Sequence, residues 1–230
     1  MPDYFSHAIC AQKILEKLDK DTKSKIEDRT LYLLGAQGGD VFFAYKLNFK
    51  NTNLGRKLHL IDGERLFPVL MQGNLSYAAG FATHYALDCT LHPAVYAFEE
   101  SSKSPMAHAR FEADLGLYIS RKYGIQRHIL PRERVLSATF NLYDSIKRIE
   151  PEITVTGVER CLKRHFSYSR ALLKSKRTSY AFDYDFSSLS TSVEDAVSLG
   201  AECVKAVISK DWSFGLFSTP FLSRQSNTLS

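Results

Sequence analysis

The sequence predicts an all-α fold, formed by a single-domain helical bundle. Apolar residues recur at helical spacing over most of the chain, and no alternating strand pattern of useful length interrupts them. The 230 residues suffice for one large domain or two small ones, and no repeat or low-complexity tract divides them. Apolar residues make up 44% and charged residues 24%, which is ordinary globular usage and excludes a disordered or collagen-like chain.

Helix start and stop signals divide the chain into segments. An apolar stripe predicts the first helix over residues 5–18, with Asp3 or Ser6 as its N-cap. Adjacent glycines then break the chain immediately before Asp40. Further helices are predicted near Asp62 or Gly63, from Asn74 to Pro93, from Pro105 to Tyr123, and over residues 133–149, 154–176 and 193–210. Polar or aromatic segments are predicted over residues 19–30, 46–57, 99–104 and 180–192.

Two residues set helix ends. Pro93 lacks an amide hydrogen and is predicted to end the helix from Asn74, while Gly124 is predicted to end the helix from Pro105. We expect residues 1–217 to form the domain and residues 218–230 a polar, flexible tail.

Charge and cysteine content narrow the function classes. Thirty Lys and Arg against 25 Asp and Glu give a net charge of +5, which permits an anionic partner without requiring one. The four cysteines are far apart, so the sequence contains neither a C-x-x-C zinc motif nor a disulfide framework. No secretory leader or apolar run of about 18 residues is found, so no transmembrane segment and a cytoplasmic location are expected.

Metal-binding side chains collect in the helix predicted from Asn74. His84, Asp88 and His92 are four residues apart, a drift of about 40° per step, so they share one helix face. Imidazole and carboxylate groups are ligands that Zn²⁺ accepts. His84 and His92 would be about 12 Å apart along the axis. Two ions that share the carboxylate of Asp88 therefore fit better than one.

The next predicted helix repeats this pattern. His108 and Glu112 are also four residues apart, and two such helices side by side can complete metal sites between them. Flanking apolar residues such as Phe81 and Phe111 indicate that both ligand faces point inward. The alternative is a polar seam of buried ion pairs, which is costly when desolvated. We therefore predict a metal cleft between helices.

These residues also carry a family resemblance. The pattern Gly80-x3-His84-x3-Asp88-x3-His92-Pro93, followed by His108-x3-Glu112, resembles the core of the zinc-dependent phospholipase C family. The segments Pro2-Asp3-x3-His7 and Gly35-Ala-Gln-Gly-Gly-Asp40 agree with it, so the resemblance covers roughly residues 1–120. That family is similar in architecture to single-strand nucleases with a trinuclear zinc centre.

The resemblance implies an all-helical fold with three zinc ions in a cleft. One ion would be held by Asp40, His59, His84 and Asp88, a second by His92, His108 and Glu112, and His7 would join Asp88 around the third. Together with the spacing argument, the expectation is two or three Zn²⁺ ions.

The resemblance also implies a zinc-dependent hydrolase of phosphoric esters, in which a metal-activated water attacks phosphorus. Asp40 would orient or deprotonate that water. The expected partner is a phosphate-ester substrate, with a phospholipid as one candidate. The alternatives are a nuclease or phosphomonoesterase on the same metals, or a non-catalytic helical protein that metal stabilises. Sequence alone leaves the substrate and the oligomeric state open.

Basic residues crowd the helix predicted over residues 154–176 and the residue after it. They are Arg160, Lys163, Arg164, Arg170, Lys174, Lys176 and Arg177, against the single acid Glu159. Such a face could attract an anionic lipid surface or a nucleic-acid backbone, although a solvated charged face is the simpler interpretation. His128 and His165 have no partner at ligand spacing and are interpreted as ordinary histidines.

Overall fold

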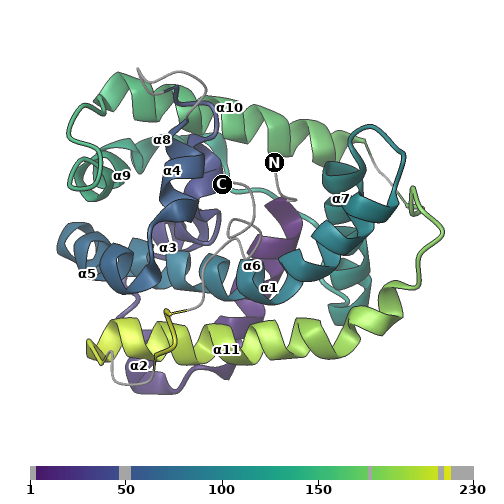
Figure 1. The fold of residues 1–230 in the computed structure, drawn as a ribbon. Helices are drawn as coiled ribbons and strands as arrows, with labels where there is room; N and C mark the ends of the chain where they lie inside the picture. Colours follow the sequence, from purple (N-terminus) through teal and green to yellow (C-terminus); the bar gives the residue numbers. More distant parts are fainter. Residues whose placement is uncertain (1–3, 47–52, 176–177, 212–214, 219–230) are drawn as a thin grey trace, which may run out of the picture.

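One long helix, α6 (Leu75–Ser101), runs through the middle of the computed structural model (Figure 1). The structure describes residues 4–46, 53–175, 178–211 and 215–218. From Ser76 to Asp88 every residue of α6 is buried, because α3 (Arg29–Gly35) and α11 (Ser190–Ser209) pack along it. A helix covered on all sides belongs to the core. Polar side chains on α6 are therefore held at the centre of the molecule.

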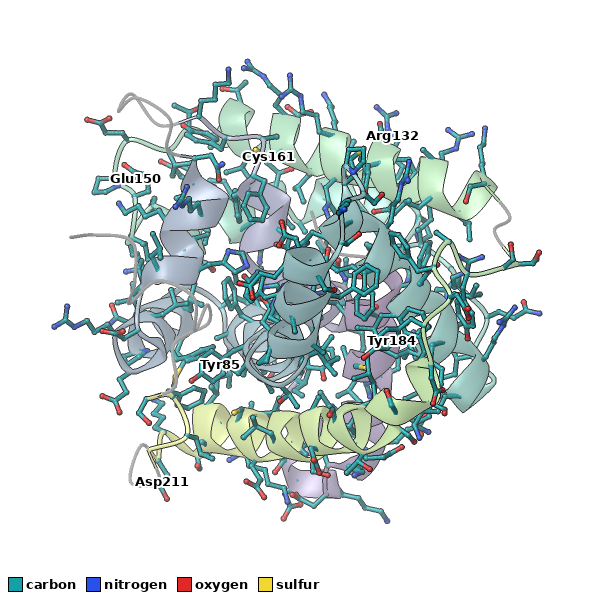
Figure 2. All side chains as sticks on the ribbon, turned by 45° about the vertical axis from the view of Figure 1, so that its right-hand side comes forward. Tyr85, Arg132, Glu150, Cys161, Tyr184 and Asp211 are labelled. Atoms are coloured by element: carbon teal, nitrogen blue, oxygen red, sulfur yellow. The ribbon has the colours of Figure 1, made fainter. Side chains whose placement is uncertain are left out.

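The described residues form helices and no β-strand, which confirms the predicted all-α, single-domain fold. The other helices are α1 (Tyr4–Lys17), α2 (Lys20–Ser24), η1 (Gly38–Phe42), α4 (Leu54–Leu60), α5 (Gly63–Gly73), α7 (Ala107–Tyr123), α8 (Arg132–Ser137), α9 (Thr139–Ile146), α10 (Val155–Lys174) and η2 (Phe186–Leu189). Side chains fill the space between them (Figure 2). Within the described part of the chain, no helix is both long enough and apolar enough to cross a membrane.

Several predicted helix ends are confirmed. The side chains of Asn74 and Thr154 accept hydrogen bonds from backbone amides in the first turns of α6 and α10, which is the usual function of an N-cap. Gly124 lies at the C-cap of α7, as predicted. Ser6 lies inside α1 and is buried, so it is not an N-cap, and Asp3 lies outside the described residues.

The prediction that Pro93 ends α6 is wrong. The helix continues to Ser101 because its last turns pack against α7, where the rings of Phe98 and Phe111 stack 4.5 Å apart. This packing offsets the roughly 3 kcal/mol that a proline costs inside a helix. The prediction that α7 begins at Pro105 is also wrong, since Met106 has a left-handed backbone, with φ 64°, and the helix begins at Ala107.

Other segments are more helical or more divided than predicted. The predicted connection over residues 46–57 contains the start of α4, because the side chain of Asn53 accepts the amide of Arg56 at 2.8 Å. The predicted helix over 133–149 divides into α8 and α9, and segments 19–30 and 180–192 contain α2 and η2. Residues 47–52, 176–177 and 219–230 lie outside the described residues, so the domain and tail boundaries stay predictions.

A close helix crossing fixes the segment that follows α3. A Cβ atom on Gly80 of α6 would lie 2.0 Å from the carbonyl oxygen of Tyr32 of α3, so only glycine fits there. The crossing leads the chain from α3 directly into η1, which packs against both α6 and α4. In this way the Gly-Gly segment that precedes Asp40 comes to lie beside the central helix.

Candidate metal centre

Five elements bring polar side chains together beside the middle of α6. They are His7 from α1, Asp40 from η1, His59 from α4, His84, Asp88 and His92 from α6, and His108 and Glu112 from α7. All of them except His108 are buried. The structure thus brings all eight predicted site residues into one cluster. We call His7, Asp40, His59 and His84 the inner group, and His92, His108 and Glu112 the outer group.

A glycine lets η1 touch the inner group. Gly38 has a left-handed backbone, with φ +50°, and a Cβ atom there would lie 2.0 Å from Cδ2 of His84. The backbone of η1 therefore lies directly on the His84 ring. This contact holds the Asp40 carboxylate 3.4 Å from Nε2 of His59 and 3.9 Å from Nδ1 of His84.

Two members of the inner group, His59 and His84, have with Asp88 the spacing of donors around a single cation. Nε2 of His59 lies 3.0 Å from Nε2 of His84, and both nitrogens lie within 3.5 Å of Oδ2 of Asp88. Ligand atoms bound at about 2.0–2.1 Å to a tetrahedral Zn²⁺ are about 3.3 Å apart. Nδ1 of His59 lies 2.8 Å from the carbonyl oxygen of Gly55 and donates to it, so in the neutral ring Nε2 carries the lone pair that could bind a cation.

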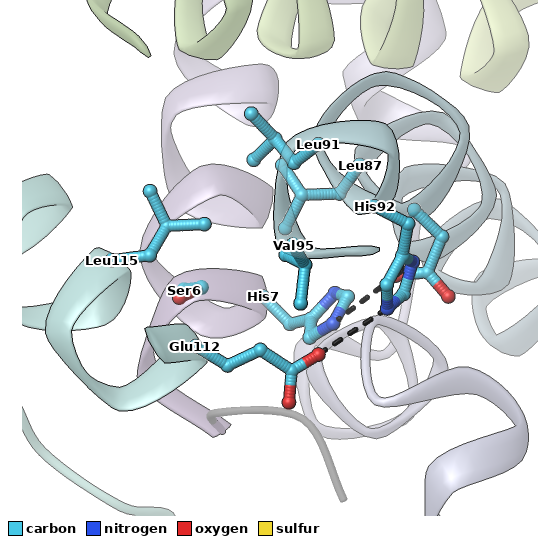
Figure 3. Close-up of a pocket in the computed structure, with 9 residues that line it drawn as sticks. Ser6, His7, Leu87, Leu91, His92, Val95, Glu112 and Leu115 are labelled. Atoms are coloured by element: carbon cyan, nitrogen blue, oxygen red, sulfur yellow. Dashed lines mark hydrogen bonds and ion pairs between the residues drawn. The ribbon is translucent and has the colours of Figure 1, made fainter. Parts of the chain in front are cut away.

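The outer group is a second set of three donors. Nε2 of His92 and Nε2 of His108 lie 3.2 and 3.1 Å from Oε1 of Glu112. His7, His92 and Glu112 point toward one another beside a cavity of about 20 Å³, which leucine side chains close on one side (Figure 3). That volume is enough for about one water molecule. The His108 side chain is 27% exposed, so the cluster reaches solvent at this end.

Asp88 lies between the two groups. Its Oδ2 faces His59 and His84, whereas its Oδ1 lies 3.5 Å from Nε2 of His7 and 3.5 Å from Nδ1 of His92. One carboxylate thus touches both groups. Nε2 of His92 faces Glu112, so the Asp88 contact at Nδ1 orients the His92 ring, and the bridging role that the residue spacing suggests stays a prediction.

The cluster concentrates buried charge. Burial would raise the pKa of Asp88, but the imidazoles around it, His84 and His92 first, hold that pKa far below its usual range. Burial raises the pKa of Asp40 to about 8, against the opposing effect of His59. Both oxygens of Asp40 and Oε2 of Glu112 have no hydrogen-bond partner among the described residues. Buried polar atoms without partners are costly, and bound cations would satisfy these oxygens.

Two residues near the cluster were not among the predicted ligands. Oε2 of Glu99, on α6, accepts a hydrogen bond from Nδ1 of His108 at 3.1 Å. His165 of α10 is buried against the ring of Tyr4, 5.6 Å between centroids, and burial first, then His7, lowers its pKa to about 4. It belongs to none of the donor groups. A predicted helix that continued past Pro93 could have indicated Glu99, because Glu99 would then lie on the same helix as His92. No sequence pattern points to His165.

Comparison with known protein families finds a match over most of the chain. Residues 6–176 match the zinc dependent phospholipase C family. The match runs from α1 to the end of α10 and contains all eight residues of the cluster. No curated protein and no solved structure matches the chain.

Proposed function

Because the chain belongs to the zinc-dependent phospholipase C family, we propose that it hydrolyses the phosphodiester bond of a phospholipid at a zinc centre. The observation that supports this most strongly is the joined pair of donor groups, in which one carboxylate, Asp88, contacts histidines of both. A single structural ion would not need two groups. Family membership supports a zinc-dependent phosphoesterase, and the phospholipid substrate is our finer proposal.

The donor chemistry fits two or three zinc ions. Asp40, His59, His84 and Asp88 would hold one ion, and the outer group a second. His7 would join the inner side, where it forms a third set of donors with Asp40 and His84. The unpartnered oxygens of Asp40 and Glu112 are the atoms that such ions would satisfy. When bound, zinc would polarise phosphoryl oxygens and lower the pKa of water.

The outer group favours catalysis over a purely structural site. It offers two histidines and one glutamate, and a tetrahedral zinc with three protein ligands keeps one position for water or substrate. Structural zinc sites are usually closed by four protein ligands. The partial exposure of His108 places the accessible edge of the cluster at this group. We therefore propose that the substrate phosphate approaches past His108.

Asp40 is the proposed base. In hydrolysis a water oxygen bonds to phosphorus, the bond to the glycerol oxygen breaks, and that oxygen takes up a proton. A carboxylate near the attacking water can orient it and accept its proton. Asp40 lies within 3.9 Å of three histidines and its oxygens have no hydrogen-bond partner among the described side chains and backbone. Zinc bound to one of these oxygens would keep Asp40 ionised, and the other oxygen would be placed to act on a water in the inner group.

The proposal is tested with zinc-loaded protein and three substrates in parallel. Phosphatidylcholine in mixed micelles should yield phosphocholine and diacylglycerol, whereas single-stranded DNA and p-nitrophenyl phosphate should be turned over slowly or not at all. Cleavage of DNA or the monoester alone would replace the phospholipid assignment with a nuclease or phosphomonoesterase. No turnover by protein with verified zinc content would favour a non-catalytic, metal-stabilised protein.

Glu99→Gln is expected to weaken zinc binding at the outer group. The carboxylate of Glu99 accepts from Nδ1 of His108 and so leaves Nε2 free to bind metal. Loss of such a partner usually lowers metal affinity or activity about 10–100-fold. Zinc titration against a competing chelator measures the change. Glu100→Gln, its exposed neighbour, serves as the control, and equal zinc affinity in the two variants would contradict the role.

A further inference from the structure

We propose that the outer face of α10 is a docking surface for an anionic phospholipid membrane. This basic face consists of Arg160, Lys163, Arg164, Arg170 and Lys174, all of which are exposed. The proposal goes beyond the metal centre, which no residue of the basic face enters. The choice of a lipid surface as the partner rests on the proposed function.

Helix geometry puts these cations on one side. At 100° per residue they fall within an arc of about 120°, and from Arg160 to Lys174 they extend over about 21 Å. The opposite side of α10 is the buried stripe of Val158, Cys161 and Leu162. The cations are therefore fixed in one direction, away from the core. Nitrogen-tipped side chains project outward along α10 in Figure 2.

Four of the five cations of the basic face have no neutralising partner among the described residues. Glu159 pairs with Lys163 at 2.7 Å, whereas Arg160, Arg164, Arg170 and Lys174 form no ion pair with any described carboxylate. Exposed cations without partners keep their full attraction for an external anion. The face therefore has a net positive charge that the fold does not use.

Neighbouring elements extend the basic face at two hollows. One, of about 360 Å³, lies between the end of η1 and the start of α10, and Lys46 joins Arg160 and Arg164 there. The other, of about 470 Å³, is lined by Arg132 of α8 together with Arg170, Lys174 and the half-buried ring of Phe166. Each hollow combines cations with enough room for a phosphate group. Figure 2 shows Arg132 beside α10.

The partner that fits is a surface with many phosphates. Two cationic hollows at separate positions along one helix match neighbouring anionic headgroups. Each basic residue near an anionic bilayer strengthens binding about fivefold. α10 also packs against η1, which carries Asp40, so the basic face lies on the outer side of a helix whose inner side borders the metal centre. Docking there would hold the centre close to its proposed substrate.

The test is vesicle co-sedimentation with two double variants. Arg160→Gln/Arg164→Gln and Arg170→Gln/Lys174→Gln alter the two hollows separately. Zinc-loaded protein is mixed with phosphatidylcholine vesicles with or without phosphatidylserine, and lipid phosphate is checked afterwards for hydrolysis. We expect binding only with phosphatidylserine, about thirtyfold weaker in each variant and weaker at high salt. The control Lys20→Gln/Lys25→Gln removes the same charge at α2, across the molecule from α10 in Figure 1.

Other outcomes separate this inference from the proposed function. Turnover of a monomeric short-chain phosphatidylcholine should be equal in all variants, because the basic face lies outside the metal centre. Vesicle binding without any hydrolysis would leave the docking surface intact and count against the proposed activity. Vesicle binding that is equal in the variants and the wild type would overturn the docking surface. Binding of single-stranded DNA without vesicle binding would assign the face to nucleic acid instead.

Discussion

Replacing Asp88 by asparagine is expected to remove metal from both donor groups and to lower hydrolysis by more than about 100-fold. Oδ2 of Asp88 lies 3.3 Å from Nε2 of His84, and Oδ1 lies 3.5 Å from Nδ1 of His92. Oδ2 would be a ligand of the inner ion, whereas Oδ1 faces the Nδ1 side of His92, whose Nε2 is the outer donor. An amide would therefore be a poorer ligand at the inner group and would remove the anionic partner of His92 at the outer group. Removal of a residue that only orients a metal ligand already costs about 10–100-fold, so loss of a residue that is itself a ligand and also orients His92 should cost more.

Asp40→Asn is the comparison variant for Asp88→Asn, because Asp40 contacts one donor group whereas Asp88 contacts both. Asp40 touches only the inner group, through His7, His59 and His84, so its loss should leave the outer group with its metal. Elemental analysis of the zinc-loaded proteins measures the zinc content of each variant. Asp21→Asn, at an exposed position on α2, is the control for the change in charge. Retained metal with little hydrolysis in Asp40→Asn would support its role as base. Equal metal loss in both variants would contradict a role of Asp88 in both groups.

The central helix α6 explains why its three candidate metal ligands could be predicted from the sequence. His84, Asp88 and His92 belong to one helix, so their relative positions follow from its rise and twist alone. The same holds for His108 and Glu112 on α7. The structure adds that α6 is buried on all sides as far as Asp88, so these side chains face other elements. Spacing could therefore indicate which donors share a face.

Contacts between distant elements could not be predicted in the same way. His59 reaches the inner group because α4 begins at an Asn53 cap, in a segment whose composition indicates a loop. Glu99 reaches His108 because α6 continues beyond Pro93, where local helix rules place a stop. In both cases tertiary packing outweighs local preference. For this reason family resemblance placed His59 in the site, whereas residue spacing did not.

Removal of metal is expected to lower the melting temperature by about 10 °C, and zinc should restore it. Cations that bind only the folded chain stabilise it by about 4 kcal/mol at a thousandfold excess over Kd. In a domain of this size each kcal/mol corresponds to about 2–4 °C. Without cations the carboxyl groups of Asp40, Asp88 and Glu112 are buried close together, and several of their oxygens have no hydrogen-bond partner in the described structure. Thermal unfolding with and without a chelator measures the shift.

Mild acid, like the chelator, should lower the melting temperature of the zinc-loaded protein. Zinc binds neutral imidazole, so lowering the pH through about 6.5, the ordinary pKa of histidine, replaces metal by protons. Burial holds the pKa of His84 well below that value, so the folded chain binds a proton there less readily than the unfolded chain. Protonation at His84 therefore favours unfolding as the pH falls below about 6.5. In metal-free protein His92 acts in the opposite direction, because Asp88 and Glu112 raise its pKa to about 9 against the effect of burial, so the loss of metal is the main cause of the expected acid effect. A cluster stabilised only by ion pairs would not respond to a chelator at neutral pH. An unchanged midpoint in protein verified to be metal-free would thus exclude a zinc-stabilised centre.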